Sequence, residues 1–327
     1  MPIPGSIVGL LLLFAALLLK ICPTQWVETG SVFLLDYLPL LFVPATAGVM
    51  NYFNLFAGRT VWLFVITIIS TLLVMIFAGH TSRFFGKGQG KAKGESGLSK
   101  ALIGIVFVSL TVFIYRFMTR VYHRFNLPFL IPALTSTFAV VLLLLLVGVP
   151  YDTYMIGGQW IDALLGPAIV ALAYPLYNQR YLLVKNLFPI LGGVFVGSLT
   201  GISSGLLLAE LLGFREELLF SLLPKSVTTP VAMQIADGLG GLPSLAVLFV
   251  MTAGFTGVVV GPSILRLFRV DDSLAKGMAF GSASHVIGTS KAVEYGDYTT
   301  SVSSVAMTLS AIACSIFGPL IVLLFYA

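Results

Sequence analysis

Long runs of apolar residues, separated by short polar stretches, dominate this chain. Three such runs lie near 2–21, 32–50 and 60–79. After a long polar stretch, eight more follow, near 101–118, 129–149, 160–177, 187–212, 216–236, 244–267, 274–292 and 301–326. A helix needs about 20 predominantly apolar residues to cross a bilayer. The pattern therefore predicts an all-α polytopic membrane protein with about 10–11 membrane segments.

The composition narrows the protein class further. Of the 327 residues, 58% are hydrophobic and only 9% are charged, and the mean hydropathy is +1.02. Soluble domains carry about 25% charged residues. These values exclude soluble, disordered, collagenous and nucleic-acid-binding classes, so the lipid bilayer is the expected partner and nucleic acid is not.

One polar stretch divides the chain into two modules. Residues 83–100 read RFFGKGQGKAKGESGLSK, with five basic residues, five glycines and one acid. Glycine-rich, polar composition is typical of a flexible linker, and excess Lys and Arg favours the cytoplasmic side. We predict an N-terminal module at 1–80, a basic cytoplasmic linker at 81–100 and a C-terminal module at 101–327.

The eight C-terminal runs show an internal period. Adding 115 to the starts of the first four gives nearly the starts of the last four, which suggests structural repeats at 101–213 and 216–327.

Basic residues follow the same period. The loops at 116–124, 178–186 and 266–276 are basic, whereas 148–160 and 237–243 contain no Lys or Arg. All three basic loops are cytoplasmic only if 216–236 does not fully cross the membrane. The same holds for 101–118, because the linker before it and the loop after it are both basic. If both leading segments are re-entrant or interfacial, each repeat crosses three times and the second is inverted, as in secondary transporters. The net charge of +5 then mainly reflects Lys and Arg residues in cytoplasmic loops.

The segment 222–233, LLPKSVTTPVAM, is the first candidate site. Two prolines six residues apart prevent a regular lipid-facing helix, and a broken helix presents N–H groups and a positive dipole end that favour an anion. One alternative is a kinked helix whose hydroxyls satisfy its own carbonyls, with a lysine that reaches the interface. The predicted carboxylate-binding residues are Lys225, Ser226, Thr228 and Thr229.

The segment 281–291, GSASHVIGTSK, is the second candidate site. A histidine among small polar residues can donate to a carboxylate or carry a coupling proton. The alternative is a structural histidine bonded to a neighbouring helix. Lys291 and Glu294 are expected to form a surface pair. The predicted binding residues are Ser282, Ser284, His285, Thr289 and Ser290, with His285 as the proton-coupling candidate.

Two further segments have mainly structural interpretations. The prolines in 165–177 predict kinks, and Tyr174 there is a weaker candidate for a cavity wall. Glycines at 193, 197, 201 and 205 share one helix face and predict a packing seam. The two cysteines, Cys22 and Cys314, are not spaced as metal ligands, and no catalytic group, metal or cofactor is expected.

Several motifs resemble known families. The runs PIPGSIVGLLLLF (2–14) and LPLLFVPATAGVMNY (38–52) resemble the LrgA/CidA family, described as holin-like. Three C-terminal runs resemble the LrgB/CidB family, namely LGPAIVALAYPLY (165–177), SLLPKSVTTPVA (221–232) and GSASHVIGTSKA (281–292). A chain carrying both modules is similar to fused proteins that include the plastidial glycolate/glycerate translocator and bacterial relatives.

The resemblance implies movement of small monocarboxylates of the glycolate, glycerate or pyruvate class. We expect a secondary transporter that works by alternating access, with proton co-transport and carboxylate exchange as open alternatives. The expected assembly is a homo-oligomer, namely a dimer. The alternative function is a holin- or antiholin-like regulator of lysis or murein hydrolase export. An enzyme is not expected. The expected location is the bacterial cytoplasmic membrane, with the chloroplast inner envelope as alternative.

Overall fold

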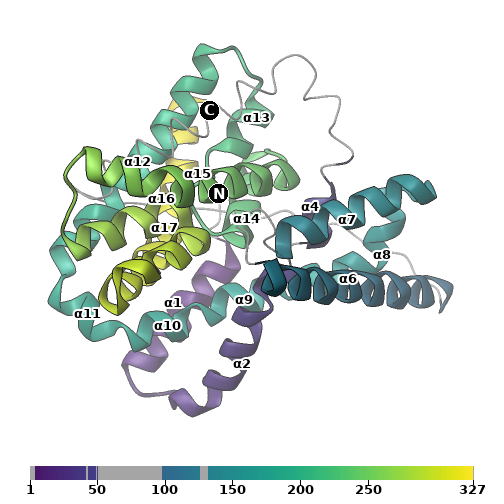
Figure 1. Cartoon of the computed structure of the whole chain (residues 1–327), viewed down its shortest axis with the longest axis horizontal. Helices are drawn as coiled ribbons and strands as arrows, with labels where there is room; N and C mark the ends of the chain where they lie inside the picture. Colours follow the sequence, from purple (N-terminus) through teal and green to yellow (C-terminus); the bar gives the residue numbers. More distant parts are fainter. Residues whose placement is uncertain (1–3, 42, 49, 51–97, 126–131, 327) are drawn as a thin grey trace.

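The computed structural model describes residues 4–41, 43–48, 50, 98–125 and 132–326. Within these residues the chain is helical and has no strand (Figure 1). The chain is therefore an all-α polytopic membrane protein, as predicted. The predicted segment at 60–79 lies outside the described residues, as does nearly all of the linker at 81–100. Five described spans are long and apolar enough to cross a membrane, namely Ile103–Arg124, Tyr151–Asn178, Leu187–Leu211, Pro243–Leu267 and Asp297–Phe325.

The described N-terminal helices pack against the C-terminal module. They are α1 (Gly5–Leu18), α2 (Thr24–Asp36), α3 (Leu38–Leu41) and α4 (Val43–Ala47). Breaks separate α2, α3 and α4, as expected for a run that contains Pro39 and Pro44. Helices α1 and α2 lie along α9 (Leu165–Ala171) and α10 (Ala173–Asn178).

Three helices form a group to one side of the molecule in Figure 1: α6 (Leu98–Phe125), α7 (Pro132–Val147) and α8 (Tyr151–Asp162). The re-entrant form predicted for 101–118 is wrong, because this segment lies within the single 28-residue helix α6. It contains no proline, so nothing removes a backbone donor and breaks the helix. The interfacial alternative stays a prediction.

Short helices then lead into a long one. The proline-containing region forms α9 and α10, and α11 (Arg180–Lys185) precedes α12 (Leu187–Leu211). All four glycines of the predicted seam are buried in α12.

The segment after α12 folds as a hairpin that turns back before crossing. Helix α13 (Glu216–Leu222) runs to a non-helical tip, and α14 (Thr229–Leu239) runs back. The return is shown by Leu242, whose backbone N–H donates to Ser221 Oγ at 2.6 Å. A Cβ placed on Gly241 would lie 2.7 Å from the Ser221 nitrogen. We call residues 216–242 the first hairpin, and it confirms that 216–236 does not fully cross.

A second hairpin follows α15 (Pro243–Leu267). Helix α16 (Ser273–Ala292) is broken at His285, whose φ of 44° and ψ of −133° are not helical. Beyond the break the chain folds back, because a Cβ on Gly288 would lie 2.5 Å from the Phe280 carbonyl oxygen. The Phe280 and Tyr295 rings also meet, with centroids 5.6 Å apart. We call residues 273–295, which include the 3-10 helix η3 (Val293–Tyr295), the second hairpin.

The two hairpins enter the protein from opposite ends of α15. The first hairpin closes at Leu242, where α15 begins, and the second opens at Ser273, shortly after α15 ends. Since α15 is 25 residues long and is a candidate span, its ends lie on opposite sides of the membrane. Helix α17 (Asp297–Phe325) packs along the second hairpin and also contacts α12 and α14.

We expect Gly288→Val to destabilise the second hairpin. The new Cβ would overlap the Phe280 carbonyl oxygen, a backbone atom that cannot rotate away. Overpacking of this kind costs about 1–3 kcal/mol. The measurement is the thermal midpoint of the purified protein in detergent, which should fall.

The matched control is Gly30→Ala, because a Cβ at Gly30 meets nothing within 4 Å. This variant should melt at the wild-type temperature or slightly above it. An unchanged midpoint for Gly288→Val would show that the hairpin does not close in this way.

Candidate functional site

The tips of the two hairpins meet at a cavity of about 110 Å³. The first tip contributes Thr228, Thr229 and Pro230, and the second contributes His285, Val286 and Ile287. Helix α15 adds Met251, and the N-terminal module adds the remaining wall, which consists of Leu35, Leu38 and Pro39. The prediction that 222–233 and 281–291 face each other is therefore confirmed.

The first tip presents hydroxyl groups that have no partner. Thr228 is the N-cap residue of α14, yet its side chain makes no cap hydrogen bond. Its Oγ1 is buried without a hydrogen-bond partner among the described residues, and the side chain is only 1% exposed. Ser226 Oγ is unpartnered in the same way. Buried hydroxyls normally find partners, so both groups have an unused donor, and of the two only Thr228 lines the cavity.

The helix that follows Thr228 adds a favourable field. The first N–H groups of a helix lack partners within that helix, and its N-terminus carries a partial positive charge. Helix α14 has 11 residues and begins at Thr229. Its N-terminus therefore opens beside the cavity with the polarity that suits an anion.

The second tip is anchored to α15 through His285. The His285 Nε2 lies 2.9 Å from the Val250 carbonyl oxygen. A carbonyl only accepts, so Nε2 carries the hydrogen and Nδ1 is the ring's acceptor. Ser284 Oγ donates to the Ala253 carbonyl at 3.4 Å. His285 is therefore bonded to a neighbouring helix, as the structural alternative expects, and it also lines the cavity. Its binding of a carboxylate or of a coupling proton stays a prediction.

Two of the other predicted residues connect the second hairpin to α17. Ser310 Oγ donates to Ser282 Oγ at 3.1 Å. Thr289 Oγ1 donates to the His285 carbonyl at 2.9 Å and also lies 2.9 Å from Ser303 Oγ. These side chains hold the tip in place and do not line the cavity.

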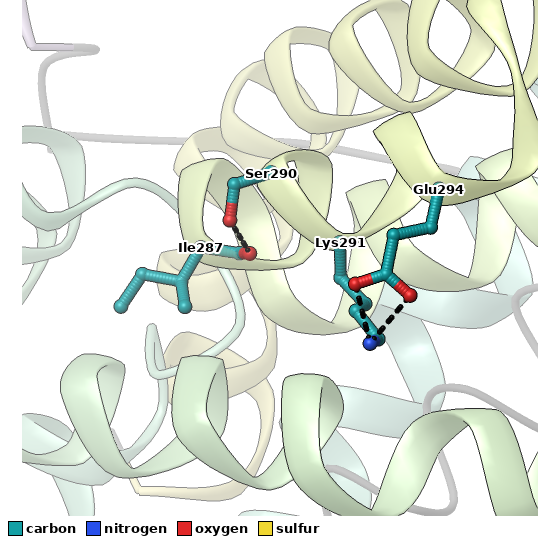
Figure 2. A network of polar contacts seen from close by, with 4 residues as sticks. All are labelled: Ile287, Ser290, Lys291 and Glu294. Atoms are coloured by element: carbon teal, nitrogen blue, oxygen red, sulfur yellow. Dashed lines mark hydrogen bonds and ion pairs between the residues drawn. The ribbon is translucent and has the colours of Figure 1, made fainter. Parts of the chain in front are cut away.

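The last residues of the motif have local roles. Figure 2 shows Ser290 Oγ, which donates to the Ile287 carbonyl at 2.7 Å, and Lys291, which pairs with Glu294 at 2.6 Å. Lys291 and Glu294 form the i,i+3 pair that the sequence predicts. Neither Ser290 nor Lys291 lines the cavity.

Lys225 is fully buried and points away from the cavity lining. Its Nζ donates to the Gly201 carbonyl of α12 at 2.7 Å. The alternative that it reaches the interface is therefore wrong. The glycine seam explains the contact, because the absence of a side chain at Gly201 leaves its carbonyl accessible. Sequence reasoning identified both features and did not connect them.

The wall from the N-terminal module was not predicted. Leu35 belongs to α2, while Leu38 and Pro39 belong to α3. The only signal in the sequence is the proline-rich run that begins at Leu38, which indicates a broken helix and says nothing about its neighbours.

The geometry limits what this site can hold. The cavity of about 110 Å³ is large enough for a few water molecules or a small anion. Hydroxyls, a helix N-terminus and one imidazole suit a small anion bounded by an apolar wall. Among the described residues there is no cluster of three metal-ligating side chains.

Comparison with known families covers nearly the whole chain. The LrgA family matches residues 1–82, and the LrgB-like family matches residues 111–324. No solved structure matches.

Individual relatives align with the C-terminal module. The chain is 56% identical to the uncharacterized protein YxaC of Bacillus subtilis over 229 residues, which is 70% of this chain and 100% of that protein. It is 36% identical to the holin-like protein CidB of Staphylococcus aureus over 222 residues, 68% of this chain and 97% of CidB. These matches show that the chain is a bacterial-type membrane protein that belongs to the LrgB-like family and carries an LrgA family module in front of it.

Proposed function

We propose that the protein is a secondary transporter of small monocarboxylates of the glycolate, glycerate or pyruvate class. The observation that carries this proposal is Thr228 Oγ1, a buried and unpartnered hydroxyl beside a helix N-terminus in the cavity between the tips. A carboxylate would accept from this hydroxyl and lie in the favourable field of α14.

The cycle follows from the two hairpins. Each tip closes the cavity toward one side of the membrane, because the hairpins enter from opposite ends of α15. Movement of one hairpin away from the other would expose the cavity to one side at a time. Broken helices around a midplane site are a recurring basis of alternating access.

The other predicted residues support the cavity in different ways. Ser226 offers a second free hydroxyl near the tip, and Thr229 lines the cavity directly. Lys225 lies in the same tip, where its bond to the Gly201 carbonyl holds the tip against α12. We expect the protein to work as a homo-oligomer in the bacterial cytoplasmic membrane.

A holin-like role is the second candidate, and it is favoured by the name of the CidB relatives. A holin-like pore would let larger solutes pass without selection. The small cavity between the two tips supports selective transport instead.

We expect Thr228→Val to weaken uptake. Valine matches threonine in shape and suits the extended backbone at this residue (φ −63°, ψ 142°). The variant removes one hydrogen bond to an anion, a loss that raises the apparent KM for labelled glycolate in proteoliposomes by about 10- to 100-fold. Thr300→Val is the control. Thr300 Oγ1 donates to the Gly296 carbonyl four residues earlier, and Thr300 does not line the cavity.

Proteoliposomes loaded with a fluorescent dye larger than a monocarboxylate should retain it during glycolate, glycerate or pyruvate uptake. The measurement is dye release, recorded in the same vesicles as uptake. Release of the dye with no saturable uptake would support the holin-like role and end the transporter proposal.

We also expect Leu38→Ala to change substrate selection. Leu38 is 6% exposed and forms part of the apolar wall, so truncation leaves extra space that a longer side chain can fill. The ratio of kcat/KM for a four- or five-carbon 2-hydroxy acid to that for glycolate should rise. Leu12→Ala is the control, because Leu12 is 66% exposed on α1. An unchanged ratio would show that the N-terminal module does not affect which substrate is selected.

A further inference from the structure

A second, larger cavity lies along α14 between Pro230 and Asp237. Its volume is about 370 Å³. Pro230 lines both cavities, so the two adjoin at the start of α14. The lining residues come from α8, α9, α14 and α15, and the polar ones are Tyr151, Asp162, Gln234, Asp237 and Ser244.

Two carboxylates from different helices face this cavity. Asp237 shares one face of α14 with Pro230 and Gln234, at helical spacings of three and four residues. Asp162 is the last residue of α8. Its Oδ1 is sealed from solvent and has no hydrogen-bond partner among the described residues, whereas Asp237 is exposed. One carboxylate therefore lies at the mouth and the other reaches deeper.

Among the described residues, no positive side chain lines this cavity. The titratable residues that line it there are Asp162, Asp237 and Tyr151, with no Lys, Arg or His. A carboxylate at membrane depth is costly when it lacks a counter-charge. Two carboxylates at one site also disfavour ionisation of both. A proton held by the pair removes both costs.

The position of the cavity indicates where protons would enter. Tyr151 and Ser244 lie at the starts of α8 and α15, next to the connections at 148–150 and 240–242. Neither loop contains Lys or Arg. Because basic loops favour the cytoplasm, these loops belong on the outer side, and Asp237 is exposed to protons from outside.

We propose that Asp162 and Asp237 form the proton site of the transport cycle. Asp237 lies on α14, and the N-terminus of the same helix borders the proposed anion site. This inference rests on the proposed transport function. One proton from the outer solution adds to a carboxylate of the pair and leaves to the cytoplasm after the change of access. A monocarboxylate that moves with one proton carries no net charge, so the membrane potential does not oppose its entry. The coupling role then falls to the carboxylates and not to His285.

The test uses the full chain in proteoliposomes with an acidic outer solution. With a gradient of one pH unit, one-to-one coupling allows the wild-type protein to accumulate labelled glycolate about tenfold. Asp162→Asn replaces the acid with a neutral group of the same shape. Its accumulation ratio should fall to about one, while exchange of labelled for unlabelled glycolate continues. Asp152→Asn is the matched control, an exposed acid in the first turn of the same helix that does not line the cavity.

Each outcome decides the inference. Loss of accumulation with retained exchange supports it, and Asp237→Asn at the exposed mouth provides the same test if Asp162→Asn does not fold. Accumulation that persists in both variants overturns it, as does wild-type uptake that follows a sodium gradient and ignores pH. If the wild-type protein neither exchanges nor accumulates any of the three carboxylates, the proposed function itself fails.

His285→Gly separates the two proton-site assignments. Glycine adopts the positive φ of this residue without strain, so the backbone of the tip is kept while the imidazole is lost. Under the carboxylate assignment, any glycolate uptake that remains in this variant still depends on the pH gradient. Residual uptake that no longer responds to pH would assign the proton to His285 and overturn the inference.

Discussion

The structure depends on one constraint: a backbone inside a bilayer must have its N–H and C=O groups satisfied or covered by protein. Two hairpins break their helices in the interior, and both breaks are enclosed. The break around Lys225 is sealed by α12 and α17, and the one at His285 by α15 and α17. Once protein encloses such a break, its unpaired polar groups are shielded from lipid and can bind a ligand.

The two breaks have different origins, which explains how well each could be predicted. Prolines at 224 and 230 remove donors in the first hairpin, so the interruption is visible in the sequence. The second hairpin turns at His285, and a positive φ is uncommon at any residue other than glycine. No proline or glycine occupies that position. The reversal is held by tertiary bonds from Nε2 to Val250 and from Thr289 to Ser303. Sequence identified the polar motif there, and the turn itself depends on contacts that only the fold creates.

The same distinction applies to the candidate site. Thr228, Thr229 and His285 could be predicted because polar groups in apolar segments are exceptional. The roles of Ser282, Thr289 and Lys225 could not, because a hydroxyl or an ammonium that binds a ligand and one that joins two helices have the same local sequence. The apolar wall at Leu38 was equally hidden, since an apolar residue in a membrane protein needs no special explanation. Asp162 and Asp237 carried a signal as acids within or beside apolar segments, but they are 75 positions apart, and nothing in the sequence gave a reason to pair them.

Helix α14 is the element that joins these features into one mechanism. Its N-terminus borders the cavity between the tips, its Pro230 lines both cavities, and its Asp237 lines the larger one. Because α14 is a short rigid rod of 11 residues, it transmits a displacement at one end to the other. An anion bound at Thr228 and a proton held near Asp237 would therefore favour or oppose the same movement of the first hairpin. Coupling between the two sites then requires only that both ligands bind one position of this helix better than the other.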